Sequence, residues 1–252
     1  MARNAGAIPS TTVDSSIGMG AATAAGNQAT YCGGSEDAAA TMDTVSHCQA
    51  GECVAILNGT VTAIVSRATF VQFNADGFRL NWTEVSGVAS NVFYIAIAGG
   101  SWLVGDLLTQ TDTVTAITES GFGFQPAGAM FISACAAEDA SDTLHANDQW
   151  TCGAFASATE RGTQGMLDED NVADSEVSTA VEFDELYVNI STASTVQGLM
   201  DVQSVDGDGF TNIMDGADSS QSFVWYLTGG NVTAAGWEQL LSHRRSHLVL
   251  PT

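Results

Sequence analysis

One stretch of the chain has the oxygen spacing of a calcium-binding loop. Residues 204–215 place side-chain oxygens at loop positions 1, 3, 5, 9 and 12 and a glycine at position 6, as in an EF-hand loop. The first position is a serine, however, and the last is an aspartate instead of the usual bidentate glutamate. We therefore interpret the stretch as a turn, with weak calcium binding as the alternative and no other cofactor. The calcium candidates are Asp206, Asp208, Asn212 and Asp215.

The cysteines are a second place where chemistry could occur. Cys48 and Cys53, with Cys32 and His47, could approach one another as zinc ligands, but no second tight pair accompanies their Cys-x4-Cys spacing. The odd count of five does not indicate a disulfide framework in a chain of this length. We expect reduced, packed thiols, with a Cys48–Cys53 or inter-strand disulfide as the alternative.

Catalytic patterns are weak throughout the chain. His145 lies near Asp142 and Asp148, and no serine or cysteine stands in a nucleophile-elbow sequence. The carboxylates of residues 168–170 fall in a predicted turn, where charged side chains are normally solvated, so they do not indicate a glycosidase. We predict that the protein is not an enzyme. Tryptophans available for a sugar-binding platform are Trp82, Trp102, Trp150, Trp225 and Trp237, most of them at strand positions expected to face a core.

The charge balance excludes several classes of partner. Lysine is absent, and six arginines stand against 29 acidic residues, which gives a net charge of −23. Nucleic acids and anionic lipids are both bound through basic side chains, so we expect neither as a partner. The N-terminus shows no apolar segment of the kind found in signal peptides, and we therefore do not expect secretion by that route.

The elements that must position these residues follow an internal repeat. The apolar run at residues 52–57 has a counterpart at 185–190, and the turn at 74–77 has one at 206–209. The apolar runs are short, rich in Val, Ile, Phe, Tyr and Thr, and bounded by Gly, Asn and Asp, which is typical of β-strands. We predict an all-β fold of two tandem β-sandwich (jelly-roll-like) units related by internal duplication, plus a short C-terminal helix.

The two predicted units differ in completeness. Apolar runs at 113–117 and 129–134 open the second unit, whereas only a polar stretch precedes Gly18 in the first. Residues 92–98 are apolar throughout, and we predict a strand that is buried on both faces. An edge without its opening strands must be covered by the N-terminal arm, the C-terminal tail or another chain. The predicted boundaries are 1–16 (arm), 17–100 (first unit), 101–230 (second unit) and 231–252 (basic tail).

The C-terminal tail differs in character from the repeat. Residues 233–248 have the spacing of an amphipathic helix capped by Thr233. Basic side chains gather in its last turns, where the helix dipole favours them. Such a helix packs on its own acidic body or docks on a neighbouring subunit, and both interpretations remain open. The candidate partner-binding residues are Trp237, Leu240, Leu241, Arg244 and Arg245.

The run Asp-Gly-Phe-x-Leu-Asn-Trp-Thr at residues 76–83, followed by the apolar run ending in Gly99 and Gly100, resembles a module of tailed-bacteriophage virion proteins. In that family a Gly-Phe-Gln-Pro opening strand precedes these elements, and the second unit contains that sequence at residues 123–126. Tandem copies are usual in the family. This chain departs from the pattern because its first unit lacks the opening strands and its second unit has Thr-Asn-Ile-Met at residues 211–214.

The resemblance implies a structural component of a tailed-phage virion, assembled in the host cytoplasm and located in the particle. We expect a capsid decoration or protrusion subunit that forms a homo-oligomer, or binds other virion proteins, through its incomplete first unit or its C-terminal tail. The alternatives are a tail or neck (fibre-type) virion protein and a carbohydrate-binding β-sandwich module with a glycan as its partner.

Overall fold

The computed structural model describes residues 2–4, 15–36, 43–87, 90–139, 143–172 and 176–230, and this part of the chain is all-β. Its strands are β1 (Ala2–Asn4), β2 (Ser15–Ala24), β3 (Asn27–Glu36), β4 (Asp43–Ala50), β5 (Val54–Leu57), β6 (Ile64–Asn74), β7 (Gly77–Glu84), β8 (Ser90–Val92), β9 (Ser101–Leu108), β10 (Ile117–Ser120), β11 (Gly128–Ser133), β12 (His145–Ala146), β13 (Asp148–Ser157), β14 (Glu160–Asp168), β15 (Val177–Glu182), β16 (Tyr187–Ile190), β17 (Val196–Asp206), β18 (Gly209–Gly216) and β19 (Phe223–Gly230). In these residues no helix is long and apolar enough to cross a bilayer.

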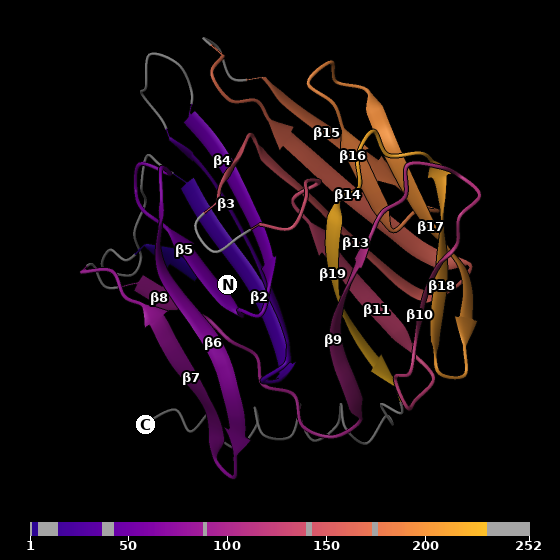
Figure 1. The fold of residues 1–252 in the computed structure, drawn as a ribbon, viewed down its shortest axis with the longest axis horizontal. Helices are drawn as coiled ribbons and strands as arrows, with labels where there is room; N and C mark the ends of the chain where they lie inside the picture. The colour runs from indigo at the N-terminus through magenta and orange to yellow at the C-terminus, as the bar shows by residue number, and fades with distance from the viewer. Residues whose placement is uncertain are drawn as a thin grey trace, which may run out of the picture.

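The strands form four antiparallel sheets that stack as layers (Figure 1). Sheet A has the order β12-β4-β3-β2-β1-β8, and sheet B has the order β5-β6-β7. Sheet C has the order β15-β14-β13-β11-β19-β9, and sheet D has the order β10-β18-β17-β16. Hydrophobic clusters lie between sheets B and A, between A and C, and between C and D. The layer order is therefore B, A, C, D.

Strand β19 lies in the middle of this stack, which explains its almost continuous burial. Successive side chains of a strand point to opposite faces of the sheet. Accordingly, Phe223 and Trp225 pack in the cluster shared with sheet A, whereas Val224 and Tyr226 pack in the cluster shared with sheet D. A strand covered on both faces needs apolar residues at nearly every position, and β19 has them.

The predicted strand at residues 92–98 is wrong for most of its length. Only β8, which ends at Val92, is a strand, and residues 93–98 lie in no strand of the described part of the chain. Several of their side chains are exposed, with Tyr94 at 70% and Ile95 at 84%. The physical reason is the lack of neighbours: β19 lies between the full-length strands β11 and β9 in sheet C, whereas β8 ends sheet A beside the three-residue strand β1.

We call sheets A and B the first group and sheets C and D the second group. The strands predicted to open the second group were found in part. The apolar run at 129–134 forms β11, but the run at 113–117 becomes a strand only from Ile117 onward, as β10. Strand β9 was not predicted, because Gly105 and Asp106 divide its apolar residues into two short runs. Residues 2–4 of the predicted arm form β1, which pairs with β2 and β8. The predicted C-terminal helix lies outside the described residues.

Candidate functional site

Two aromatic rings at the outer edge of sheet B mark the most unusual surface of the described chain. Phe78 of β7 and Tyr94 meet edge to face, with ring centroids 4.9 Å apart and an interplanar angle of 82°. Other large apolar side chains of β6, β7 and the segment after β8 also reach solvent, and we name the set the open edge. Its members are Phe73, Phe78, Leu80, Trp82, Tyr94, Ile95 and Ile97.

The second group contains a matching aromatic pair that is fully covered. Phe210 of β18 and Tyr226 of β19 also meet edge to face, at 5.1 Å and 75°, and are 0% and 2% exposed. The ring of Phe122 lies 5.5 Å from that of Phe210 and 6.0 Å from that of Tyr226. Phe131 of β11 contacts both rings as well, at 5.6 and 5.9 Å. The covering residues therefore come from the segment of residues 117–133, which opens the second group.

Strand β10 adds a second layer of cover to the second group. It pairs with β18 from Ile117 opposite Asn212 to Ser120 opposite Gly209. Strand β7, by contrast, is an edge strand in sheet B, with β6 on its inner side. An edge strand presents backbone N–H and C=O groups to solvent and can take up a further strand. The open edge thus combines a strand edge with exposed aromatic rings.

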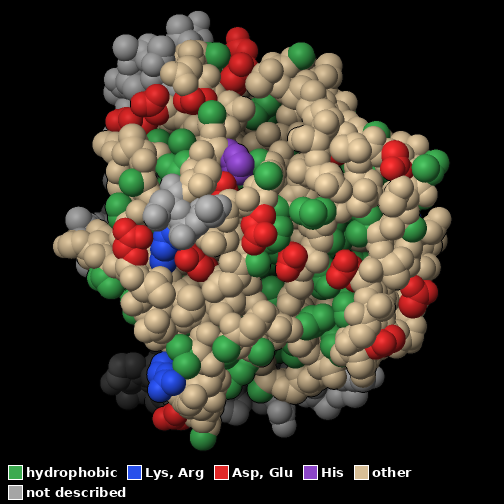
Figure 2. Space-filling view, viewed as in Figure 1, with side chains coloured by type: hydrophobic (Ala, Val, Ile, Leu, Met, Phe, Trp, Pro, Cys, Tyr) green, Lys and Arg blue, Asp and Glu red, His purple; other side chains and the backbone are tan. Residues whose placement is uncertain are grey.

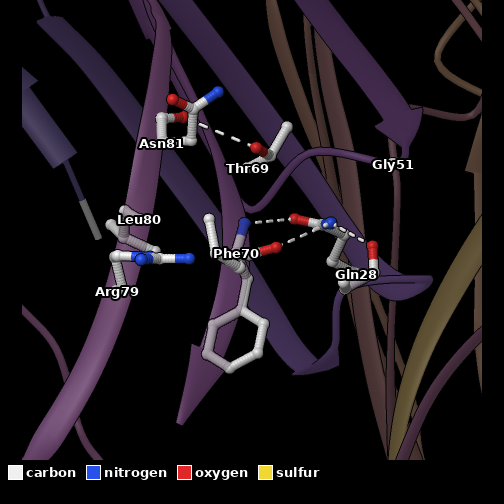
Figure 3. A pocket seen from close by; sticks show the side chains of 9 residues that line it. Gln28, Gly51, Thr69, Phe70, Arg79, Leu80 and Asn81 are labelled. Atoms are coloured by element: carbon white, nitrogen blue, oxygen red, sulfur yellow. Dashed lines mark hydrogen bonds between the residues drawn. The ribbon is translucent and has the colours of Figure 1, made fainter. Parts of the chain in front are cut away.

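A cleft with a volume of ≈ 670 Å³ lies on the inner side of β7, between β6 and the turn after β2 (Figure 3). The side-chain amide of Gln28 accepts a hydrogen bond from the Phe70 N–H at 2.6 Å and donates one to the Phe70 carbonyl at 3.4 Å. Arg79 extends from β7 toward Phe70 in Figure 3. Among the residues that line the cleft, no nucleophile stands beside a base. Its lining residues are Ala25, Gln28, Gly51, Thr69, Phe70, Val71, Arg79, Leu80 and Asn81.

The four calcium candidates do not converge on one point. Asp206 lies at the hairpin that joins β17 to β18, and Asn212 and Asp215 lie farther along β18. The Asp208 carboxylate accepts hydrogen bonds from the Gly121 and Gly123 N–H groups, at 3.2 and 2.5 Å. The Asn212 side chain is fully buried, and its amide has no hydrogen-bond partner among the described residues. The described part of the chain holds no group of three or more His, Cys, Asp or Glu side chains arranged for a metal ion.

The three thiols considered as zinc ligands pack in three different hydrophobic clusters, with Cys48, Cys53 and Cys32 one in each. All five cysteines are free, and Cys32, Cys48, Cys53 and Cys135 are buried. Burial raises the pKa of the Cys53 thiol to about 11 and raises the pKa of Cys32 well above its usual range. These thiols are therefore protonated and unreactive at neutral pH. Each packs as a small apolar side chain.

His47 and His145 share one carboxylate, which the sequence did not reveal. His145 Nε2 lies 2.9 Å from one oxygen of Asp139, and His47 Nδ1 lies 3.3 Å from the other. Asp139 also accepts a hydrogen bond from the Cys48 N–H at 2.9 Å. The loop before β12 is thereby fastened onto β4 of sheet A. Because His47 is fully buried, we interpret this His–Asp–His cluster as a structural contact. The candidate neighbour Asp142 lies outside the described residues.

A second buried contact joins sheets A and C. The Tyr31 hydroxyl of β3 donates a hydrogen bond to Asp148 of β13 at 2.8 Å. Burial, opposed by this hydrogen bond and assisted by the nearby Asp168 carboxylate, raises the pKa of Asp148 to about 6. Asp168 itself is buried at the end of β14, so the predicted solvated turn at 168–170 is wrong for this residue. No local sequence pattern identifies such partners, because the hydrogen bond joins residues 117 positions apart.

The tryptophans do not form a platform. Trp225 is buried in the core between sheets A and C, and Trp102 and Trp150 are partly buried. Trp82 is the exposed one, on the open edge, and Trp237 lies outside the described residues. Acidic side chains are spread over both halves of the face drawn in Figure 2, whereas the basic ones visible there lie on the side of sheets A and B.

The candidate partner-binding residues of the C-terminal tail are not among the residues that the structure describes. They are Trp237, Leu240, Leu241, Arg244 and Arg245. Comparison of the chain with protein-family models, curated proteins and solved structures finds no match. The open edge, which combines edge strand β7 with the partly exposed contact of Phe78 and Tyr94, is taken as the candidate functional site.

Proposed function

We propose that the protein is a structural subunit that assembles with further copies of itself through the open edge of an incomplete first unit. The contrast between the pair of half-buried Phe78 and exposed Tyr94 and the fully covered pair Phe210 and Tyr226 carries this proposal. An exposed apolar strand edge of this kind is an aggregation hazard in a monomer and a binding surface in an assembly.

The two groups of sheets are, in this proposal, duplicated β-sandwich units. Gly20 of β2 lies against the Cys53 carbonyl, and Gly153 of β13 lies against the Leu186 carbonyl. The offset is 133 residues in both cases (153 minus 20 and 186 minus 53). A Cβ atom at either glycine would clash with backbone of the facing sheet, so the same position needs glycine twice.

The irregularities of the sheets support duplication more strongly than the regular strands do. Register shifts occur between Ala22 and Ala24 in the β2–β3 pair, and between Phe155 and Ser157 in the β13–β14 pair. The pairs β5–β6 and β16–β17, and the pairs β6–β7 and β17–β18, shift at matching positions in the same way. A bulge is a local feature of a strand that is kept within a family, so this agreement favours common descent.

The units proposed on this basis keep the boundaries 17–100 and 101–230. Two strands from outside residues 17–100 nevertheless belong to sheet A of the first unit. Strand β1, from the N-terminal arm, occupies in sheet A the place that β11 occupies in sheet C. Strand β12, from the second unit, pairs with β4 of the first. Among the described residues, sheets A and B contain no counterparts of β9 and β10, so this part of the first unit lacks the strands that cover the second.

The virion setting follows from the resemblance of residues 76–83 and 123–126 to the tailed-phage module. An all-β, acidic subunit with an edge to be filled suits a capsid decoration or protrusion protein in the assembled particle. A net charge of −23 keeps free subunits apart until specific contacts form. A tail or neck position would use the same surface.

Sedimentation velocity of the full chain over a range of concentrations and salt tests the proposal. We expect a defined oligomer, and we expect Tyr94→Asp to shift it to monomer, because a buried unpaired charge opposes association. The matched control is Val114→Asp, which changes a side chain that is 82% exposed in the second unit. A monomer at every concentration that instead binds glycans, and loses them on chelation, would contradict the assembly proposal and support the carbohydrate-binding alternative.

A further inference from the structure

We propose that the occupant of the open edge is the C-terminal segment, residues 231–252, of a second copy of the chain. In this arrangement an apolar tail lies along β7 and covers Phe78 and Tyr94, as residues 117–133 cover Phe210 and Tyr226. The inference rests on the proposed self-assembly and adds to it the segment that makes the contact.

The second unit supplies a template for the missing contact. There β10 pairs with residues 209–212 of β18, and the chain then passes Phe122 over the aromatic pair. The same relation in the first unit places an added strand beside residues 77–80 of β7, with a large apolar side chain next to Phe78 and Tyr94. In this proposal the tail binds in extended form, in place of the helix that its spacing predicts. Backbone hydrogen bonds along the edge and one aromatic or aliphatic anchor are the usual features of strand addition.

The tail has the composition that this surface requires. Its large apolar side chains are Trp237, Leu240, Leu241, Leu248, Val249 and Leu250. The other long stretch outside the described residues is 5–14, which has Ile8 and Val13 as its large apolar residues and is held at both ends by β1 and β2. Among the parts of this chain that are available, the tail is therefore the one that can supply an anchor.

The net charge of the tail favours its contact with the acidic body of a second copy. Residues 231–252 contain Glu238, Arg244 and Arg245, which give a formal charge of +1. Since the whole chain has a net charge of −23, residues 1–230 have a net charge of −24. Two bodies of that charge repel each other, and a net-positive tail is the element that lowers this repulsion on approach. Beside the open edge, β7 and its turn contribute Asp76, Arg79 and Glu84.

The length of the tail permits the contact. Strand β19 ends at Gly230, opposite Ser101 of β9. An extended chain spans at most about 3.3–3.6 Å per residue, so the tail can reach roughly 70 Å from that point. That distance exceeds the width of a domain of this size. The tail can therefore reach a neighbour while its own body stays at a distance.

Complementation between two full-length variants tests the inference. The edge variant, Tyr94→Asp, has an intact tail, and the tail variant, Leu240→Asp combined with Leu241→Asp, has an intact edge. We expect each variant alone to raise the dissociation constant of self-association at least about 30-fold, as loss of an interface anchor does. Mixing the two variants is expected to restore a 1:1 heterodimer in sedimentation velocity, because one intact edge then meets one intact tail.

The alternative results have distinct meanings. If the wild type and the tail variant form the same oligomer, the tail is not the occupant, and the inference fails while the assembly proposal stands. If the tail variant associates less but the mixture forms no heterodimer, a second copy does not supply the tail in this way, and the inference also fails. If the wild type is monomeric throughout, and a photo-crosslinker at position 94 captures the tail of its own chain, both the second-copy source and the assembly proposal are wrong. Val114→Asp is the control for all measurements.

Discussion

Phe78 and Tyr94 meet edge to face at 4.9 Å, and Phe210 and Tyr226 meet in nearly the same geometry at 5.1 Å. The two pairs are separated by 132 residues (210 minus 78 and 226 minus 94). Their surroundings differ, because Phe122 and Phe131 cover the second pair, whereas residues 1–16 contain no aromatic residue. One aromatic contact thus has two environments in one molecule, and comparing them separates the effect of burial from that of the contact itself.

Stability provides the first prediction. Phe210→Ala removes a fully buried ring, and we expect it to lower the free energy of unfolding by about 3–5 kcal/mol. Phe78→Ala removes a half-buried ring and should cost only about 1–2 kcal/mol in the monomer. Urea unfolding of both variants at low protein concentration measures the difference. Equal losses would mean that the open edge is covered in the isolated chain.

The paired glycines provide the second prediction. Gly20→Ala and Gly153→Ala each place a methyl group against a backbone carbonyl of the facing sheet, and we expect each to cost about 1–3 kcal/mol or more. Gly207→Ala is the control, because a Cβ atom there meets nothing within 4 Å and the position equivalent to it in the proposed duplication is already Ala75. Thermal unfolding checks all three, and a neutral Gly153→Ala would contradict the close approach of β13 to the Leu186 carbonyl.

The sequence predicted the elements whose pattern is local. The strands on either side of the turns at 74–77 and 206–209 form the hairpins β6–β7 and β17–β18, and both are antiparallel pairs. The prediction of a strand at residues 92–98 was wrong, although their apolar pattern matches that of a strand buried on both faces. Burial depends on neighbouring strands, and sheet A has no full-length strand beside these residues. Local periodicity indicates which side chains seek a core, but the presence of that core is a property of the whole fold.

The polar contacts between sheets were not predictable for a related reason. Tyr31 and Asp148, or His47 and Asp139, are far apart in sequence, and nothing in their local context identifies a partner. The open edge could be predicted only as a deficiency, through the strands missing before Gly18. The aromatic contact at this edge was not predictable, because the fold brings Phe78 and Tyr94 together from positions 16 residues apart.

Glu185 provides the third prediction. It is buried, and burial, followed by the nearby carboxylates of Asp215 and Asp201, raises its pKa to about 8. A carboxyl group whose pKa is raised on folding binds a proton more tightly in the native state, so stability falls as the pH rises from about 4.5 to about 8. We expect Glu185→Gln to remove this loss and to stabilise the protein by about 1–2 kcal/mol at pH 8, with little effect at pH 4.5.

Glu52, at the matching position of the first unit, is the control for that experiment. It lies 3.1 Å from Arg67, whose buried guanidinium also lies 3.4 Å from Glu84. Glu52→Gln removes the more buried of these two carboxylates from a buried guanidinium and should destabilise the protein. Opposite signs for the two Glu→Gln changes in chemical denaturation at pH 8 are the expected result. Destabilisation in both cases would show that Glu185 is ionised and well paired in the native state.

The His–Asp–His cluster provides the fourth prediction. The hydrogen bond to Asp139, opposed by burial, raises the pKa of His145. Burial alone would raise the pKa of Asp139, but hydrogen bonds from His145, His47 and the Cys48 N–H lower it overall. The His145 contribution is complete below about pH 6.5 and is lost as the pH rises through its folded pKa; the Asp139 contribution is lost on acidification below about pH 3.8.

Hydrogen-exchange protection of strand β12 is therefore expected to be highest between about pH 4 and 6.5 and to decline above that window. Asp139→Asn should lower the protection at pH 6 and flatten its pH dependence, because the neutral amide cannot stabilise an imidazolium. Strand β15 serves as an internal reference within the same sample. A pH profile of β12 that is unchanged by Asp139→Asn would exclude the cluster as the fastening of this loop.

The contact between Tyr31 and Asp148 provides the last prediction, and its sign depends on pH. Because the pKa of Asp148 is raised to about 6 on folding, its carboxyl group is neutral in the native state at pH 5 and charged at pH 8. The Tyr31 hydroxyl opposes this shift, so Tyr31→Phe should raise the folded pKa further and make ionisation of the buried group more costly. We expect the free energy of unfolding to fall by about 1 kcal/mol at pH 5, where a neutral hydrogen bond disappears, and by about 2–3 kcal/mol at pH 8, where a buried carboxylate loses its donor.

Asp148→Asn combined with Tyr31→Phe should remove the pH dependence of the tyrosine effect, since nothing at position 148 then ionises. If Tyr31→Phe costs the same at both pH values in the presence of Asp148, the carboxylate has a second donor at the interface of sheets A and C.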